Sequence, residues 1–401
     1  MLTRSLAAIC ITIGAALITA PAARALDEAH AQQGRDMLDR SVQWLLTQQD
    51  KDTGGWGVNP DPKSPQYPAI TALVLTTLLD HPQFDHRDPA VERAVRFILK
   101  YQQPDGGIYD RILPSYNTSI CLSALARVPT PQAAAAIKPA QDFLRGIQWS
   151  EDAIPMDGET GKVDESHPFY GGVGYGRHGR PDLSNLNLML QGLHDSGLSS
   201  TDPAFQRALV FLARTQMLDE TNDQPYADGS RQGGFIYATA ENKDTIGKGQ
   251  SQAAQPTVEE TLSDGTVASR LRAYGSMTYA GFKSMIYADL KRDDPRLLAA
   301  RDWIRSNYTL EENPGAGTDG LYYYFLTFAR AMDAWGVSTV DTLDAQGQPG
   351  PRRDWANDLI ARLAQLQSSD GSFTSVDDRW MENNPVLITA YAALALQHAV
   401  N

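Results

Sequence analysis

Two kinds of helical segment alternate along the chain. The first kind is amphipathic: Leu38, Val42 and Leu45 recur at helical spacing with polar residues between them. The second kind is apolar on nearly every side, as in the run from Ile70 to Leu75, and a helix of that composition is buried. Six such pairs follow one another between Met37 and Ala399. The pattern therefore predicts an all-α protein.

Six pairs predict an α6–α6 double-ring toroid, with the apolar helices inside and the amphipathic helices outside. The expected apolar helices cover 67–79, 116–126, 183–193, 274–288, 321–335 and 385–399. An open solenoid is the alternative, but it usually carries polar capping repeats at its ends. The first and last pairs resemble the middle ones. We therefore expect one closed domain over residues 26–401.

A recurring joint connects the two helices of a pair. It reads QQ…GGW at 48–56, QQPDGGIY at 102–109 and QLQSSDGSF at 365–373. A glutamine at a helix end can bond unpaired backbone groups, and glycine permits the tight reversal that follows. Two joints are long, at 150–181 and 238–270, and long irregular segments in a compact domain are usually functional. All joints should meet at one mouth of the ring.

The first 25 residues have the pattern of a secretory signal peptide. Arg4 precedes an apolar run from Leu6 to Ala20, and Ala23-Arg24-Ala25 supplies small residues for cleavage. An uncleaved anchor is the alternative, but the run is short for a bilayer-spanning helix. No later segment is long and apolar enough to span a membrane. The sequence thus predicts a secreted or periplasmic protein without an integral membrane segment.

The net charge and the cysteine content limit which partners and cross-links the chain can have. Removing residues 1–25 removes two arginines and no acid, so the formal net charge of −13 becomes −15. An acidic chain without a basic run is a poor candidate for binding nucleic acid. Cys10 lies in the signal peptide, which leaves Cys121 alone in an apolar helical context. We expect a buried thiol and no intrachain disulfide.

The glutamine–glycine–aromatic joint resembles the QW-type repeats of the squalene–hopene and oxidosqualene cyclase family. It also resembles the repeats of protein prenyltransferase β subunits, and both families share an α6–α6 toroid. The likeness is clear in pairs one, two and six and degenerate in pairs three to five. The chain has helices for one toroid, which is closer to the prenyltransferase β subunit. The repeat itself stabilises a fold and carries no chemistry.

The resemblance implies an acidic residue at the start of an inner helix. Cyclases of the family carry Asp-x-Asp-Asp-Thr-Ala or Asp-Cys-Thr-Ala there, and the nearest match is Asp182-Leu183-Ser184-Asn185. The extra acids are absent, and Asp182 also fits the N-cap of that helix. We predict Asp182 as the catalytic acid, with the cap as the competing interpretation; one residue could do both.

The metal signatures of related families are incomplete. Ser119 stands where the zinc site of a prenyltransferase would need the aspartate of Asp-x-Cys, before Cys121. Neither Asp293-Asp294 nor Asp377-Asp378 completes the Asp-Asp-x-x-Asp element that binds magnesium diphosphate. We expect neither a metal nor a cofactor.

Aromatic residues concentrate where the cavity should lie. We predict a ligand-binding wall with contributions from Tyr274, Tyr279, Tyr322, Tyr323, Trp380, His178 and Arg177. Aromatic faces suit a carbocation, but they also stack on sugar rings.

The leading hypothesis is an exported repeat protein that binds or transforms an apolar, isoprenoid-type ligand in its central cavity. A non-catalytic binding or scaffold toroid is one alternative. A glycan-active hydrolase or lyase on an α/α barrel is the other. A hydrolase needs two carboxylates across a cleft. The candidates at the mouth are Asp110, Asp182, Glu311, Glu312, Asp319 and Asp377, and a lyase could use His178 and Arg177.

Overall fold

The structure is a computed structural model that describes residues 26–61, 63–156, 158–176, 178–344 and 346–401. The predicted signal peptide and Arg177 lie outside the described residues. The α-helices are α1 (Glu28–Thr47), α2 (Pro68–Leu79), α3 (Pro89–Leu99), α4 (Pro114–Leu125), α5 (Pro131–Ile147), α6 (Leu183–Asp195), α7 (Pro203–Thr215), α8 (Gly275–Tyr287), α9 (Pro295–Ser306), α10 (Leu321–Trp335), α11 (Trp355–Leu366) and α12 (Pro385–Val400). The prediction of a mainly helical chain is confirmed.

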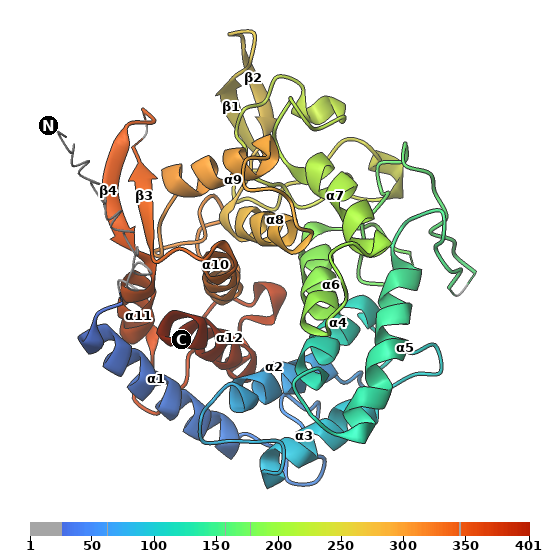
Figure 1. Ribbon diagram of the computed structural model, residues 1–401, viewed down its shortest axis with the longest axis vertical. Helices are drawn as coiled ribbons and strands as arrows, with labels where there is room; N and C mark the ends of the chain where they lie inside the picture. The colour runs from blue at the N-terminus through green and yellow to red at the C-terminus, as the bar shows by residue number, and fades with distance from the viewer. Residues whose placement is uncertain (1–25, 62, 157, 177, 345) are drawn as a thin grey trace, which may run out of the picture.

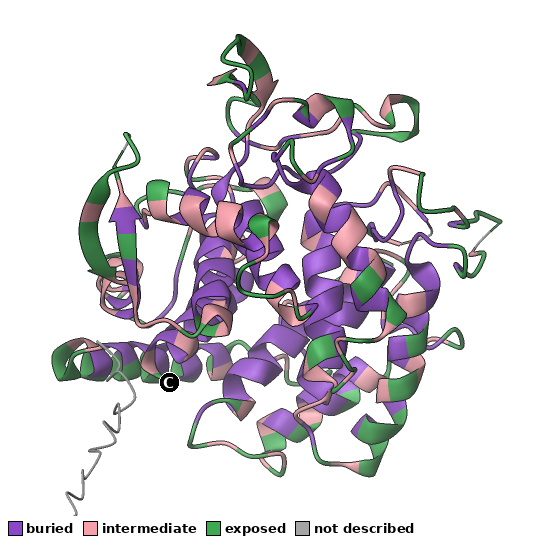
Figure 2. Ribbon diagram, turned by 45° about the horizontal axis from the view of Figure 1, so that its top comes forward, coloured by how far each residue is buried: buried purple, intermediate pink, exposed green. Residues whose placement is uncertain are grey.

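The even-numbered helices, here called the inner helices, lie around the centre of the molecule, and the odd-numbered outer helices lie outside them (Figure 1). Each inner helix packs on the next, from α2 to α4 and on to α12, and α12 also packs on α2. Figure 2 shows the inner helices buried along their length, whereas the outer helices are buried on one side only. This is the difference that the two kinds of hydrophobic pattern predict.

Two short antiparallel hairpins interrupt the helical pattern. β1 (Thr257–Thr261) pairs with β2 (Val267–Leu271), and β3 (Thr339–Leu343) pairs with β4 (Pro349–Asp354). They project from the side of the helical body (Figure 1). The hydrophobic pattern did not predict them, because β1, β2 and β4 have no fully buried residue and β3 buries only Val340 and Thr342.

The glutamine that recurs in the joints links one helix pair to the next through hydrogen bonds. The amide nitrogen of Gln148 donates to the carbonyl of Gly171 in its own joint and to that of Ala204 in α7, both at 2.9 Å. Gln49, Gln216 and Gln367 likewise bond a glycine carbonyl of their own joint and a carbonyl of the following outer helix. The bond from Gln367 reaches α1, so the last joint is tied to the first helix.

The clarity of the sequence motif did not predict which glutamines make both of these hydrogen bonds. Pairs three and four look degenerate in sequence, yet Gln148 and Gln216 make both bonds. Pair two has a clear motif, yet the side-chain amide of Gln103 donates to the carbonyls of Tyr101 and Tyr109 in its own joint. The glutamine is therefore the structural element of the repeat, and the residues around it are variable.

The glycine of the joint is required by both conformation and space. Gly171 has φ +79°, a region that favours glycine, and a Cβ there would overlap the carbonyl oxygen of Arg207 in α7. The joint thus approaches the next outer helix to backbone contact.

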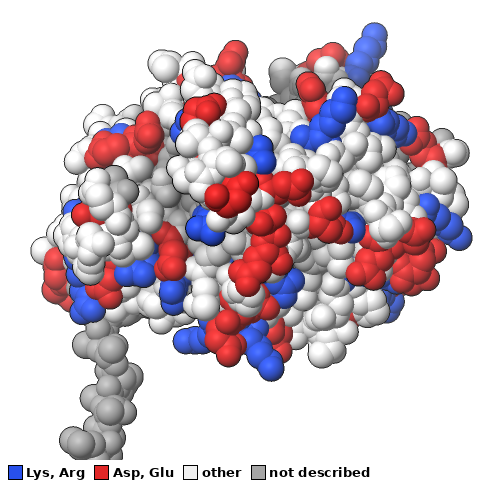
Figure 3. All heavy atoms as spheres, turned by 90° about the horizontal axis from the view of Figure 1, so that it is seen from above, with Lys and Arg blue, Asp and Glu red and all other residues white. Residues whose placement is uncertain are grey.

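Among the residues that the structure describes, no helix combines the length and apolarity needed to cross a bilayer. Acidic side chains gather on the face seen in Figure 3, interspersed with lysine and arginine.

Candidate functional site

A cavity of about 70 Å³ lies at the end of the inner helices where these helices begin. Its walls come from the first turns of α4, α6, α8 and α10, from α12, and from the joints that precede these helices. The lining residues are Tyr116, Tyr175, Ser184, Tyr237, Tyr274, Ser276, Met277, Tyr323, Trp380, Glu382 and Tyr391. We call it the mouth cavity. Six tyrosines and one carboxylate give it an aromatic wall with a single acidic group.

The tyrosines of the mouth cavity are linked in pairs through their hydroxyls. The hydroxyls of Tyr116 and Tyr391 lie 2.7 Å apart, and those of Tyr175 and Tyr237 lie 3.3 Å apart. Burial raises the pKa of Tyr116 to about 12 and that of Tyr237 well above its ordinary value. These hydroxyls therefore stay protonated at neutral pH, so the four tyrosines add no charge to the wall.

Glu382 is the carboxylate in this wall, and only 1% of its surface is exposed. Its Oε1 accepts the backbone N–H groups of Tyr322 (3.0 Å) and Tyr323 (2.9 Å), at the N-terminus of α10. Its Oε2 is buried and has no hydrogen-bond partner among the described residues. Burial raises the pKa of Glu382 to about 7, assisted by the charge of Asp377 and opposed by the two backbone donors.

The sequence did not single out Glu382. It lies in the irregular segment before the last inner helix, two residues ahead of Asn384, which caps α12. The local sequence offered one signal, which is an acidic residue shortly before an inner helix. Its importance depends on its approach to α10, about which the local sequence says nothing.

Asp182 is the N-cap of α6, as the competing interpretation holds. It accepts bonds from the Asn185 backbone N–H (3.0 Å), the Asn185 side-chain amide and the Ser184 hydroxyl (2.6 Å). It is fully buried, and burial raises its pKa. Its charge contributes to the raised pKa of Tyr175 and Tyr237, so it lies just behind the wall. Ser184, not Asp182, lines the cavity.

Two larger hollows lie on the outside of the molecule. One, of about 490 Å³, lies between the β3–β4 hairpin, α9 and α11, and the other, of about 530 Å³, adjoins α8, α9 and α10. Charged groups in the first are paired, as in the Arg353–Asp358 ion pair at 2.8 Å. The mouth cavity is smaller but holds a buried carboxyl oxygen without a partner, which makes it the stronger candidate.

Comparison with known proteins supports the fold. Residues 61–240, under half of the chain, match the squalene–hopene cyclase C-terminal domain family. The structure resembles a type II terpene cyclase from Scytonema solved with geranylgeranyl dihydroxybenzoate, with TM-score 0.53 and 15% identity over 94% of this chain and 99% of that one. The fold of the chain is therefore similar to that of terpenoid cyclases.

The structure also resembles a GH76A α-1,6-mannanase from Salegentibacter sp., with TM-score 0.54 and 9% identity over 91% of this chain and 98% of that one. A search of curated proteins finds no match. At these identities the structural likenesses show the fold alone, because one α/α architecture hosts unrelated chemistries.

Of the residues predicted to form the wall, Tyr274, Tyr323 and Trp380 line the mouth cavity together. Tyr279 and Tyr322 do not. Tyr279 packs on Phe328 with 5.1 Å between ring centroids, and Tyr322 packs on Phe373 at 5.7 Å. An inner helix is apolar all round, so its sequence does not reveal which tyrosines face the cavity.

His178 is also placed away from the cavity. It is buried in the third joint, with Nε2 2.6 Å from the carbonyl of Ile154 and its ring edge-on to Trp149. Cys121 is free and buried, and burial raises its pKa. Across the described residues, no group of three or more His, Cys, Asp or Glu side chains could hold a metal ion.

Proposed function

We propose that this chain is an exported six-pair α6–α6 toroid that binds and transforms an apolar, isoprenoid-type ligand in the mouth cavity. The observation that carries the proposal is the unpartnered Oε2 of Glu382 in a buried tyrosine wall. Residues 1–25 direct export, and residues 26–401 form the single domain. The acidic mature chain binds no nucleic acid and needs no metal or cofactor.

Glu382 acts as the general acid. With a pKa of about 7 it is protonated for much of the time near neutrality, where proton transfer is most effective. The proton leaves from Oε2 into the cavity. The negative charge left behind is stabilised by the N–H groups of Tyr322 and Tyr323 at the positive end of α10. Tyrosine faces then stabilise a developing carbocation.

The acid strength of Glu382 limits which substrate groups it can protonate. A carboxyl group with a pKa of about 7 is a weak acid, so it suits the protonation of an oxygen better than that of an unactivated alkene. The preferred ligand is therefore an isoprenoid that carries an epoxide or a hydroxyl group. The oxygen would lie against Oε2 and the apolar chain against the tyrosines.

Ligand entry requires the mouth cavity to open. Its volume of about 70 Å³ is well below the roughly 300 Å³ of ordinary ligand pockets. Trp380 and Met381 form the cover in η3 (Arg379–Met381), and both have left-handed φ angles of +55° and +65°. Non-glycine residues in that region are strained, and Trp380 is 40% exposed. Movement of η3 relieves this strain and admits the ligand.

The test is turnover of an epoxidised squalene and of a geranylgeranyl arene, followed by mass spectrometry. We expect Glu382→Gln to lower the rate about 100-fold or more. The matched control is Glu259→Gln on the exposed β1–β2 hairpin, which should leave the rate unchanged. Absence of both binding and product with the wild type would refute the isoprenoid proposal. Binding without turnover would support the non-catalytic toroid.

A glycan-active enzyme is the second candidate. Asp377 is a second carboxylate close enough to raise the pKa of Glu382, and hydrolysis of a glycosidic bond uses two. α-1,6-Mannotriose in the same assay separates the candidates. Cleavage that depends on both Asp377 and Glu382 would favour the hydrolase.

A further inference from the structure

A second, interior cavity lies below the mouth cavity, inside the ring of inner helices. Tyr116, Tyr323 and Tyr391 line both cavities and so separate them. The interior cavity has a volume of about 10 Å³, which is room for about one atom of the size of a water oxygen. Any occupant of this space is small.

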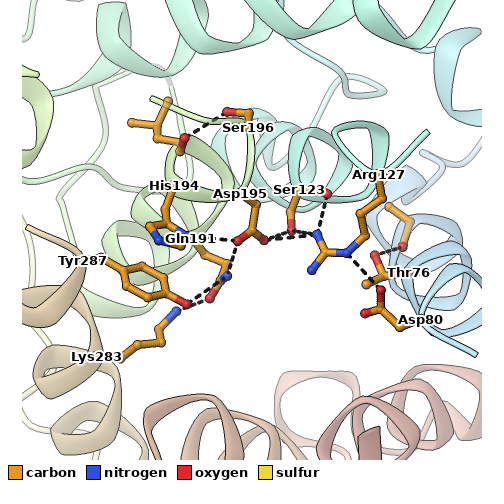
Figure 4. A network of polar contacts seen from close by, with 12 residues as sticks. Thr76, Asp80, Ser123, Arg127, Gln191, His194, Asp195, Ser196, Lys283 and Tyr287 are labelled. Atoms are coloured by element: carbon orange, nitrogen blue, oxygen red, sulfur yellow. Dashed lines mark hydrogen bonds and ion pairs between the residues drawn. The ribbon is translucent and has the colours of Figure 1, made fainter. Parts of the chain in front are cut away.

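Two cationic side chains line the interior cavity, Lys283 from α8 and Arg330 from α10. Lys283 is 1% exposed; its Nζ donates to Gln191 Oε1 and lies 4.8 Å from the ring centroid of Tyr287 (Figure 4). An ammonium group has three donors and a guanidinium has five. Within the described part of the chain, no residue forms a hydrogen bond or ion pair with the side chain of Arg330.

The nearby carboxylates are already engaged by other groups. Asp195 accepts from Gln191 at 2.8 Å and lies 3.4 Å from Arg127, and Asp80 lies 3.3 Å from the same arginine (Figure 4). A third carboxylate, Asp333, lies one turn beyond Arg330 on α10 and is 3.0 Å from His398. Burial and the charge of Arg330 lower the pKa of Lys283 well below its ordinary value.

We propose that the interior cavity binds one small monovalent anion of halide size between Lys283 Nζ and the Arg330 guanidinium. The anion accepts the hydrogen-bond donors that Lys283 and Arg330 leave unused. A buried cation without a counter-charge is costly, so such an anion stabilises the fold. A volume of about 10 Å³ leaves room for a single atom and excludes sulfate and phosphate. This site is separate from the mouth cavity and does not depend on the proposed function.

The test compares the thermal stability of the full mature protein in sodium chloride, bromide, sulfate and gluconate at constant ionic strength. The wild-type midpoint should rise by about 2 °C when the halide is at about ten times its dissociation constant, relative to gluconate. Arg330→Met should abolish the halide-dependent difference. Arg96→Met, on the exposed face of α3, should retain it.

A wild-type crystal soaked in bromide keeps the proposal testable if Arg330→Met fails to fold. An anomalous peak between Lys283 and Arg330 is expected. The proposal is overturned if saturating bromide gives no peak there, if chloride and gluconate give the same midpoint for the wild type, or if Arg330→Met keeps the full difference between chloride and gluconate.

Discussion

Replacing Glu382 by glutamine should remove the pH dependence that this residue gives to the free energy of unfolding. The pKa of Glu382 rises from its ordinary 4.5 to about 7 in the folded protein. A carboxyl group with a raised pKa makes its full contribution to the free energy of unfolding below pH 4.5, and that contribution is lost as the pH rises through 7. The rise corresponds to about 3 kcal/mol of unfolding free energy.

Glutamine keeps the carbonyl oxygen that accepts from Tyr322 and Tyr323 but has no charge to bury. At pH 4.5 the two proteins should therefore differ little. By pH 8, where the wild-type carboxylate is ionised, Glu382→Gln should be the more stable by up to about 3 kcal/mol.

Urea unfolding monitored by circular dichroism at half-unit intervals between pH 4.5 and 8 measures this difference. Glu259→Gln, which removes an exposed carboxylate, is the control and should follow the wild type. A difference between Glu382→Gln and wild type that stays flat across this range would show that Glu382 has an ordinary pKa. The acid role would then lose its physical basis.

Three further variants test the joints and the cap. Gly171→Ala should cost at least about 2 kcal/mol of unfolding free energy, whereas Gly197→Ala should cost about 1 kcal/mol or less. Both glycines have positive φ, but only at Gly171 would a Cβ overlap the backbone of a neighbouring helix. Equal losses would contradict the close approach. Gln216→Ala leaves two carbonyls without their donor and should cost about 2 kcal/mol by urea unfolding, against a few tenths for exposed Gln206→Ala. Asp182→Asn keeps an N-cap and should change stability by about 1 kcal/mol or less without loss of turnover; a 100-fold slower rate would restore Asp182 as the acid.

The helices could be predicted from the sequence because their signal is local. The expected segment 321–335 coincides with α10, and 183–193 falls within α6. The repeated glutamine also revealed its role, since a side-chain amide beside a helix end has few other partners. Periodicity and capping are properties of neighbouring residues, so they need no knowledge of the folded ring.

The site could be predicted only in part, because cavity and core tyrosines look alike in a helix that is apolar all round. Glu382 meets α10 across 60 residues of sequence, a contact that no local pattern encodes. Lys283 did leave a local signal, because it is the single charged residue of α8 in an otherwise uncharged inner helix. Such a residue costs free energy unless it has a partner or a function.

The most direct test of the central claim is a crystal structure of the Glu382→Gln variant with a bound geranylgeranyl arene or epoxidised squalene. We predict that η3 moves, that the prenyl chain lies between Tyr116, Tyr274 and Tyr391, and that its oxygen contacts the side chain at position 382. A ligand bound only in one of the outer hollows, with the mouth cavity still closed by Trp380, would contradict the claim.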